Sequence, residues 1–505
     1  MVRKKISFPD FAWLRMDDPY NLMVITGLMT FDAPLDYERL KATVERSLLP
    51  FRRFRQRLAP PKPPFMRPYW EDDPIFNLEA HLKRVQLPPP GDQTALQDLI
   101  SSLMSTELDY SRPLWEFYFV ENYGTGSAFI ARLHHAIADG IALTQVLLSL
   151  TDTEADPVPA DQSQELAQNE KHFPGGPINT LKSAVLQPDI LSPSKLWDEG
   201  KKILFDPSHA RYRARQGIDF AKDIGRLVLR WPDPMTVFKG PLGIEKRAAW
   251  SEPIELKEVK FIGKTFHSTV NDVLLTAVAG ALGRYMDSRG ESVEDVSIRS
   301  FVPVNLRPIQ LDEDLGNKFG LVFLSLPMGI SDPLERLRKV KQNMDEIKAS
   351  SEAVATFGII TLLGAVPSRI EEIAVDFFDT KGSSIMTNVP GPQIQLYLAG
   401  TPINTVMAWV PQSGRIALGV SIVSYNGKVW LGVATDKGLI PDPEAIIAFF
   451  YEEYKELVFQ AQTTEARGQE YLKPLLSKLD EAMQTLDELL AEAHKDEPDT
   501  KTPQI

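Results

Sequence analysis

The chain has 505 residues, of which 43% are hydrophobic and 24% charged, a composition typical of a soluble globular protein with enough apolar material for sizeable cores. This length favours two domains over a single core. The chain contains no cysteine, which excludes disulfides, thiolate zinc sites and a cysteine nucleophile. A formal net charge of −13 argues against a general nucleic-acid binder, because such a protein needs a basic face toward phosphates.

No window of the sequence reaches about 18 uninterrupted apolar residues, and no long apolar run follows the charged N-terminus to make a signal peptide. We therefore expect no transmembrane helix and a cytoplasmic protein, with any lipid contact peripheral to the inner face of the membrane. The apolar run 357–366 fits either a buried helix, which we favour, or a surface that meets lipid.

The first 150 residues alternate between patterns typical of strands and of helices. Branched apolar residues indicate strands, and apolar residues that recur every three or four positions indicate helices. In chain order, the predicted elements are a strand at 22–31, a helix after Asp36, a helix at 94–108, a strand at 114–121, a glycine turn, a strand ending near 133 and a helix at 140–150.

The sequence becomes polar, acidic and proline-bearing after residue 150, which predicts a linker. We divide the chain into a domain at 1–150, a linker with helical segments at 151–239, a second α/β domain at 240–462 and a C-terminal helix and tail at 463–505. The tail carries leucines at spacings of four and three over fewer than three heptads. A helix packed on its own protein is therefore preferred to a coiled coil.

Two adjacent histidines, His134 and His135, end the second strand of the predicted hairpin within the run HHAIADG. Successive side chains of a strand point to opposite faces, so only one of the two can face a given cleft. An imidazole suits general-base chemistry because its ordinary pKa, about 6.5, lies near working pH. Asp139 follows within a turn, and Gly140 opens the next helix, where glycine permits a close backbone approach or a positive φ. The spacing alone does not decide which histidine would be the base.

The run HHAIADG resembles the HHxxxDG signature of the CoA-dependent acyltransferase superfamily. Shortly upstream, Pro113-Leu114-Trp115 resembles the PLW motif of bacterial wax ester synthase/diacylglycerol acyltransferases. Further blocks that resemble this family follow in the expected order: MDDPYNLM at 16–23, GPLG at 240–243, NDVLL at 271–275, VPVNLR at 302–307, GN at 316–317, NVPGP at 388–392 and SYNG at 424–427. The ordered set, which spans roughly residues 8 to 460, carries the resemblance.

The resemblance implies an α/β fold of two chloramphenicol-acetyltransferase-like domains, whose mixed sheets are flanked by helices and face each other across a central tunnel. In such a fold His135 would be the general base, and His134 would support its orientation. The implied activity is O-acyl transfer from acyl-CoA to diacylglycerol, a long-chain fatty alcohol or both, giving triacylglycerol or wax ester.

Other residues receive structural or binding roles from the same resemblance. Asp139 would pair with an arginine that holds the loop, and Arg307, Arg55 and Arg57 are all candidates. The simpler alternative is that Asp139 only caps the helix that begins at Gly140. The candidate substrate-binding residues are Pro113, Leu114, Trp115, Gly140, Asn271 and Asp272. Plain core packing would explain Leu114 and Trp115 equally well, and Asn271 and Asp272 would serve mainly to build a helix start near the site.

The implied reaction needs no covalent acyl-enzyme, because the base activates the acceptor itself. We accordingly expect no metal and no resident cofactor, with acyl-CoA as a co-substrate. Diacylglycerol or a fatty alcohol would be the second substrate, and peripheral contact with a membrane or a lipid droplet would suit both. No nucleic-acid partner is expected.

Several other functions compete with this hypothesis. The HxxxxD spacing of His134 and Asp139 also occurs in glycerol-phosphate acyltransferases, but their later glycine-glutamate-glycine block is missing. A condensation-type acyltransferase with carrier-bound or other alcohol or amine acceptors also fits, although no carrier domain is evident. A serine hydrolase lacks its GxSxG elbow here. A catalytically inactive lipid-binding protein would have no reason to keep both histidines and the aspartate.

Overall fold

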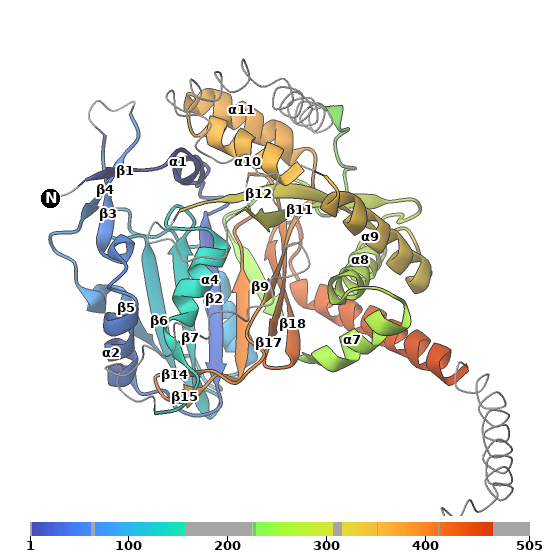
Figure 1. The fold of residues 1–505 in the computed structure, drawn as a ribbon, viewed down its shortest axis with the longest axis horizontal. Helices are drawn as coiled ribbons and strands as arrows, with labels where there is room; N and C mark the ends of the chain where they lie inside the picture. Colours follow the sequence, from blue (N-terminus) through green and yellow to red (C-terminus); the bar gives the residue numbers. More distant parts are fainter. Residues whose placement is uncertain are drawn as a thin grey trace, which may run out of the picture.

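Strands and helices alternate through most of the chain, as the sequence pattern predicts. A computed structural model describes residues 3–61, 66–156, 225, 229–306, 316–350, 352–412 and 414–467. Most of the predicted linker and the whole region beyond residue 467, with its leucine spacing, lie outside the described residues. Figure 1 shows two sheets side by side, the first carrying mainly blue and teal strands and the second mainly green to red strands.

The first half is built on a five-stranded sheet with the strand order β16-β2-β7-β6-β5. Strands β2 (Val24–Phe31), β7 (Gly126–His134) and β6 (Trp115–Tyr123) are antiparallel neighbours, and β5 (Leu82–Val85) runs parallel to β6. The predicted hairpin is therefore confirmed as β6 and β7. Its turn requires glycine at Gly126, because a Cβ there would lie 1.9 Å from the carbonyl oxygen of Phe31. Strand β7, which ends at His134, is buried along its whole length.

The helices of the first half begin at side-chain caps. Asp36, Asp92 and Asp139 each accept a hydrogen bond from the backbone N–H three residues later, which satisfies a donor that the helix itself leaves free. They start α2 (Tyr37–Ser47), α3 (Gln93–Met104) and α4 (Gly140–Leu148). Helix α1 (Phe8–Arg15), which the sequence pattern did not predict, is capped in the same way by Ser7.

A small three-stranded sheet lies beside α1 (Figure 1). Its strands are β1 (Lys4–Lys5), β4 (Tyr69–Asp72) and β3 (Gln56–Ala59), all antiparallel. The arginine-rich stretch forms a short 3₁₀ helix, Arg52–Arg55, that leads into β3. Its cations pair locally: Arg52 with Asp72, and Arg57 with Glu71.

The second half is built on a larger mixed sheet of seven strands, ordered β10-β18-β17-β13-β11-β12 with β9 added beside β18. The strands are β9 (Lys246–Trp250), β10 (Ile254–Glu255), β11 (Ser297–Asn305), β12 (Phe319–Pro327), β13 (Ser384–Pro390), β17 (Leu418–Tyr425) and β18 (Lys428–Asp436). Strand β13 is parallel to both of its neighbours, and the remaining pairs are antiparallel. This combination confirms the mixed sheet expected for the second half.

Helices cover this second sheet. They are α7 (Leu256–Thr265), α8 (Val270–Ser288), α9 (Pro333–Lys348) and a helix over 443–467. The alanine-rich α8 is buried along most of its length, because small side chains let it lie close to the strands and to neighbouring helices. Helix α10 (Glu352–Leu363) lies over β12 and next to α1, and α11 (Ser368–Asp379) lies beside α10 (Figure 1).

Helix α10 contains most of the apolar run that fitted either a buried helix or a lipid-facing surface. Its inner face packs on β12, where the Thr356 hydroxyl bonds with both the N–H and the carbonyl of Leu321 at 2.7 Å. Ile360 is buried, whereas Leu362 is 59% exposed. The run therefore combines the two interpretations: one side belongs to the protein interior and the other faces outward.

One strand of the first sheet comes from the second half of the sequence. Strand β16 (Thr405–Trp409) pairs with β2, and the short β14 (Tyr397–Leu398) pairs with β8 (Thr151–Asp152). A segment that follows residue 240 thus belongs to the first sheet. The sequence pattern predicts a strand at about 404–409, which β16 confirms, but that pattern carries no information about which sheet the strand joins.

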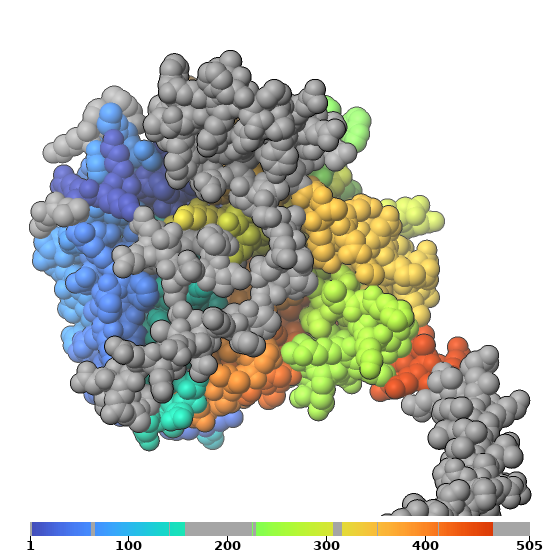
Figure 2. Space-filling model, viewed as in Figure 1, coloured from blue at the N-terminus to red at the C-terminus, as the bar shows by residue number. Residues whose placement is uncertain are grey.

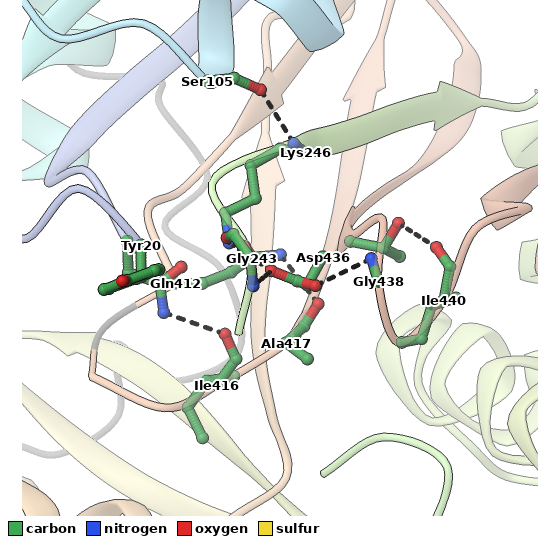
Figure 3. A network of polar contacts seen from close by, with 12 residues as sticks. Tyr20, Ser105, Gly243, Lys246, Gln412, Ile416, Ala417, Asp436, Gly438 and Ile440 are labelled. Carbon is green, nitrogen blue, oxygen red and sulfur yellow. Dashed lines mark hydrogen bonds and ion pairs between the residues drawn. The ribbon is translucent and has the colours of Figure 1, made fainter. Parts of the chain in front are cut away.

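The two halves also meet around Lys246, at the start of β9 (Figure 3). Its ammonium pairs with the Asp436 carboxylate at 2.8 Å, and both side chains are buried. Its backbone N–H donates to the hydroxyl of Ser105, which follows the last residue of α3, at 2.8 Å, and the N–H of Ala248 donates to Ser101 of α3 at 3.0 Å. Two serines one helical turn apart thus satisfy the edge of the second sheet. In the space-filling view the blue first half and the green to red second half lie against each other (Figure 2).

Candidate active site

The two histidines of HHAIADG point in different directions at the end of β7, as the alternation of a strand requires. His134 is fully buried in the first half. Its Nδ1 atom accepts the backbone N–H of Ala136 at 3.0 Å, so the ring proton of neutral His134 is on Nε2. That atom faces the Tyr110 hydroxyl at 3.1 Å and the Asp17 carboxylate at 3.7 Å. Both ring nitrogens of His134 therefore already have partners within the protein.

Asp17 connects this cluster to the backbone of His135. Its carboxylate accepts the N–H of Met23 at 2.5 Å, and the carbonyl of Met23 accepts the N–H of His135 at 2.7 Å. Burial works to raise the pKa of Asp17, but His134, Tyr110 and the Met23 amide outweigh it, and the pKa lies below its ordinary value. The block MDDPYNLM thus has a structural purpose that its sequence did not disclose.

His135 lies in an aromatic cage formed by both halves of the chain. Trp13 of α1 stacks on its ring with centroids 4.5 Å apart, and Phe319 of β12 lies at 5.4 Å. The residue is 6% exposed. Its Nδ1 atom is enclosed and has no hydrogen-bond partner among the described residues, whereas Nε2 is not enclosed in this way. One ring nitrogen is thus left accessible while the rest of the ring is held.

Burial lowers the pKa of His135 to about 4, against the opposing effect of the nearby Asp139 carboxylate. The ring is therefore neutral near pH 7, which is the form that can accept a proton. Gly140, the first residue of α4, has open space around it: no heavy atom would lie within 4 Å of a Cβ built there. Gly140 therefore shows neither the positive φ nor the close approach considered from sequence.

Backbone N–H groups on both sides of the site bind the carboxylate of Asp139 and fix the loop. One carboxylate oxygen caps α4 through the N–H of Ala142 at 2.9 Å, and the pairing of Asp139 with an arginine stays a prediction. The other accepts the backbone N–H of Lys318, in the second half, at 3.0 Å. Of the candidate arginines, Arg57 pairs with Glu71, and Arg307 lies outside the described residues. No contact between Arg55 and Asp139 occurs in the described part of the chain.

Three consecutive residues of the second half complete the site. Asn317 donates its side-chain amide to the carbonyl oxygen of His135 at 2.8 Å, the Lys318 amide binds Asp139, and Phe319 packs on the His135 ring. Asn317 itself is 4% exposed. Sequence reasoning singled out Gly316-Asn317 only as one block of a resemblance. The available signal was a small polar pair just before an apolar strand.

The remaining candidate residues lie at the start of α8 and in the core of the first half. Asp272 forms a capping box with Thr269 at the start of α8, in line with the helix-building role expected for it, and Asn271 accepts the side-chain amide of Asn388 at 2.6 Å. Leu114 and Trp115 are fully buried in the core of the first half, where the Trp115 indole donates to the Phe54 carbonyl at 2.9 Å. The described contacts therefore favour core packing for these two residues.

The two-lobed fold resembles solved acyltransferase and condensation domains. The wax ester synthase/diacylglycerol acyltransferase from Marinobacter aquaeolei VT8 aligns over 91% of this chain and 100% of its own, with a TM-score of 0.64 at 21% identity. The first condensation domain of the calcium-dependent antibiotic synthetase aligns over 91% and 96%, with a TM-score of 0.56 at 15% identity. The chain thus has the predicted two-lobed α/β fold of chloramphenicol-acetyltransferase type.

Sequence comparison identifies the family within this fold. The model of the wax ester synthase/diacylglycerol acyltransferase catalytic domain matches residues 7–274, and that of the WS/DGAT C-terminal domain matches residues 315–458. A probable diacylglycerol O-acyltransferase of Mycobacterium tuberculosis is 27% identical over 448 residues, which are 86% of this chain and 91% of the relative. The chain belongs to the wax ester synthase/diacylglycerol acyltransferase family.

Proposed function

We propose that this protein transfers a long-chain acyl group from acyl-CoA to the hydroxyl of a diacylglycerol, a long-chain fatty alcohol or both, with His135 as the general base. The observation that carries the proposal is the environment of that imidazole. The ring is neutral, caged by Trp13 and Phe319, and has one nitrogen that is not enclosed. His134 cannot take the same part, because both of its ring nitrogens already have partners.

The proposed chemistry needs one proton carrier. The Nε2 atom of His135 accepts the hydroxyl proton while the alcohol oxygen forms a bond to the thioester carbonyl carbon. The tetrahedral intermediate collapses by breaking the C–S bond, and the proton on His135 then neutralises the CoA thiolate. A neutral imidazole suits this sequence because its Nε2 atom is unprotonated at the beginning and at the end of each cycle. A shared passage for the two substrates between the lobes stays a prediction.

An assay of thiol release tests the proposal directly. Purified protein is incubated with palmitoyl-CoA and either hexadecanol or a dipalmitoylglycerol, and free CoA is followed with a thiol reagent. Because the chain has no cysteine, it adds no thiol signal of its own. We expect release that depends on the acceptor, with the ester identified by mass spectrometry. Release without an acceptor, or release only with an amine acceptor, would contradict the proposal and favour a hydrolase or a condensation-type enzyme.

The low pKa of the buried base should be visible in the pH dependence of kcat/KM. Since burial holds the pKa of His135 at about 4, we expect kcat/KM to stay level between pH 7.5 and 5.5. With an imidazole of the ordinary pKa, about 6.5, kcat/KM would instead fall roughly tenfold at pH 5.5.

Protonation of His135 also favours the unfolded chain, because its pKa is lower in the folded protein than in the unfolded one. The contribution of His135 to stability therefore falls as the pH drops from about 6.5 toward 4. Circular dichroism at each pH separates the two effects.

We further propose that the protein meets its lipid substrates through α11 and the end of α10. Ile370, Ile373 and Phe377 lie at helical spacing on α11 and are 54%, 70% and 39% exposed, and Leu362 of α10 is exposed as well. Such an apolar stripe suits peripheral contact with a membrane or a lipid droplet. Among the described residues no helix is long and apolar enough to cross a membrane.

A further inference from the structure

We propose that Asn317 orients the general base: its amide nitrogen holds the main-chain carbonyl of His135, and its amide oxygen receives the Nδ1–H of the same residue. The inference rests on the proposed function, because it assigns a purpose to the tautomer of His135. Asn317 would thus be a positioning residue, with the reacting nitrogen Nε2 left unprotonated and directed at the acceptor hydroxyl.

The orientation of the Asn317 amide is fixed by its neighbours. The Nδ2 atom donates to a carboxylate oxygen of Asp10 at 2.8 Å and to the His135 carbonyl at 2.8 Å. Both partners are acceptors, so the reversed amide would set its oxygen against two other oxygens. The same Asp10 oxygen also accepts the backbone N–H of Asn317 at 2.9 Å. Asp10 therefore anchors Asn317 at two points.

Asn317 and His135 each have one buried polar side-chain atom without a hydrogen-bond partner among the described residues, and the two atoms are complementary. The Oδ1 atom of Asn317 is a buried acceptor without a partner, and the Nδ1 atom of His135 is a buried ring nitrogen without a partner. An unpaired polar atom in the interior costs about 1–3 kcal/mol, so a hydrogen bond between these two groups would remove two such penalties. Against the larger effect of burial, hydrogen bonding of the ring with the His135 backbone and then with Asn317 acts to raise the pKa of the imidazole, which agrees with acceptor oxygens beside the ring.

Asp10 and Trp13 belong to the same short helix, so α1 supports His135 twice. Asp10 acts on the carbonyl through Asn317, and Trp13, one turn later, stacks on the ring. The second half repeats this arrangement, since Asn317 binds the carbonyl and Phe319 packs on the ring. Backbone and ring of His135 are thus fixed together, which is what a base needs in order to keep one ring nitrogen aimed at a substrate.

The first test measures the tautomer in the unmodified protein and needs no variant. With ¹⁵N-labelled histidine, the His135 signals are identified by their loss in His135→Ala. We expect the neutral ring to carry its proton on Nδ1 in the wild-type protein. A wild-type ring protonated on Nε2 would overturn the proposal. This measurement does not depend on activity, so it can fail while acyl transfer is observed, or succeed while it is not.

The second test compares Asn317→Ala with a matched control, Asn21→Ala. Asn21 is equally buried and also donates two hydrogen bonds between the halves, to the carbonyls of Gly414 at 2.6 Å and Ile416 at 3.1 Å, but none to His135. We expect Asn317→Ala to lower kcat by about 10- to 100-fold with KM changed less than about twofold, and to give a mixture of His135 tautomers. Asn21→Ala should keep kcat within about threefold. Equal losses of kcat in the two variants would show a merely structural role for Asn317.

Discussion

Replacement of His135 by alanine should abolish measurable acyl transfer, with kcat lowered by about 10²- to 10⁴-fold, the usual contribution of a general base. The alcohol would then have to lose its proton to water while it attacks the thioester. The fold should survive, because the cage residues Trp13 and Phe319 also stack on each other, with centroids 5.5 Å apart. Thiol release from palmitoyl-CoA in the presence of hexadecanol is the measurement.

A second buried histidine provides the control for this experiment. His81 is 2% exposed, its pKa is lowered by burial, and its ring stacks between Phe76 and Trp115 in the core of the first half. His81→Ala removes the same number of buried atoms away from the proposed site, so it should cost stability but leave kcat of the folded protein nearly unchanged. Full activity in His135→Ala, or an equal loss in both variants, would rule out His135 as the base.

The sequence predicted the local structure around the histidines well. The strand that ends in HHAIADG, the hairpin that brings it there and the cap at Asp139 all follow from short-range patterns, and all are present. Such features depend on neighbours within a few positions, where periodicity and turn chemistry act. The family resemblance supplied the fold, which those patterns could not specify.

The surroundings of His135 could not be predicted in the same way. Trp13, His135 and Phe319 are more than 100 residues apart from one another in the chain, and only the fold brings their rings within 6 Å. Helix α1 escaped prediction because it is short and has no clear apolar face. Likewise, nothing in the residues of β16 shows that this strand leaves its own half to pair with β2. Tertiary packing decides which distant segments meet, and a local sequence pattern carries no information about that packing.

The largest expected effect on stability comes from the buried ion pair between Lys246 of β9 and Asp436 of β18 (Figure 3). We expect Asp436→Ala to lower the free energy of unfolding by about 3–5 kcal/mol, because it leaves the ammonium of Lys246 buried without its counter-charge. The Asp436 side chain is 0% and the Lys246 side chain 8% exposed. The same carboxylate also accepts the backbone N–H groups of Gly243 at 2.8 Å and Gly438 at 3.0 Å, and these would lose their acceptor. Urea unfolding followed by circular dichroism measures the change.

Two further variants separate the charge from the contacts. Asp376→Ala breaks an ion pair with Arg415 in which the side chains are 55% and 72% exposed, and it should cost at most about 1 kcal/mol because water screens the pair. The double variant Lys246→Met with Asp436→Ala removes the stranded ammonium, so it should be more stable than Asp436→Ala alone. If the double variant were no more stable, the lost N–H acceptor of Gly243 and Gly438, and not the uncompensated charge, would account for the destabilisation.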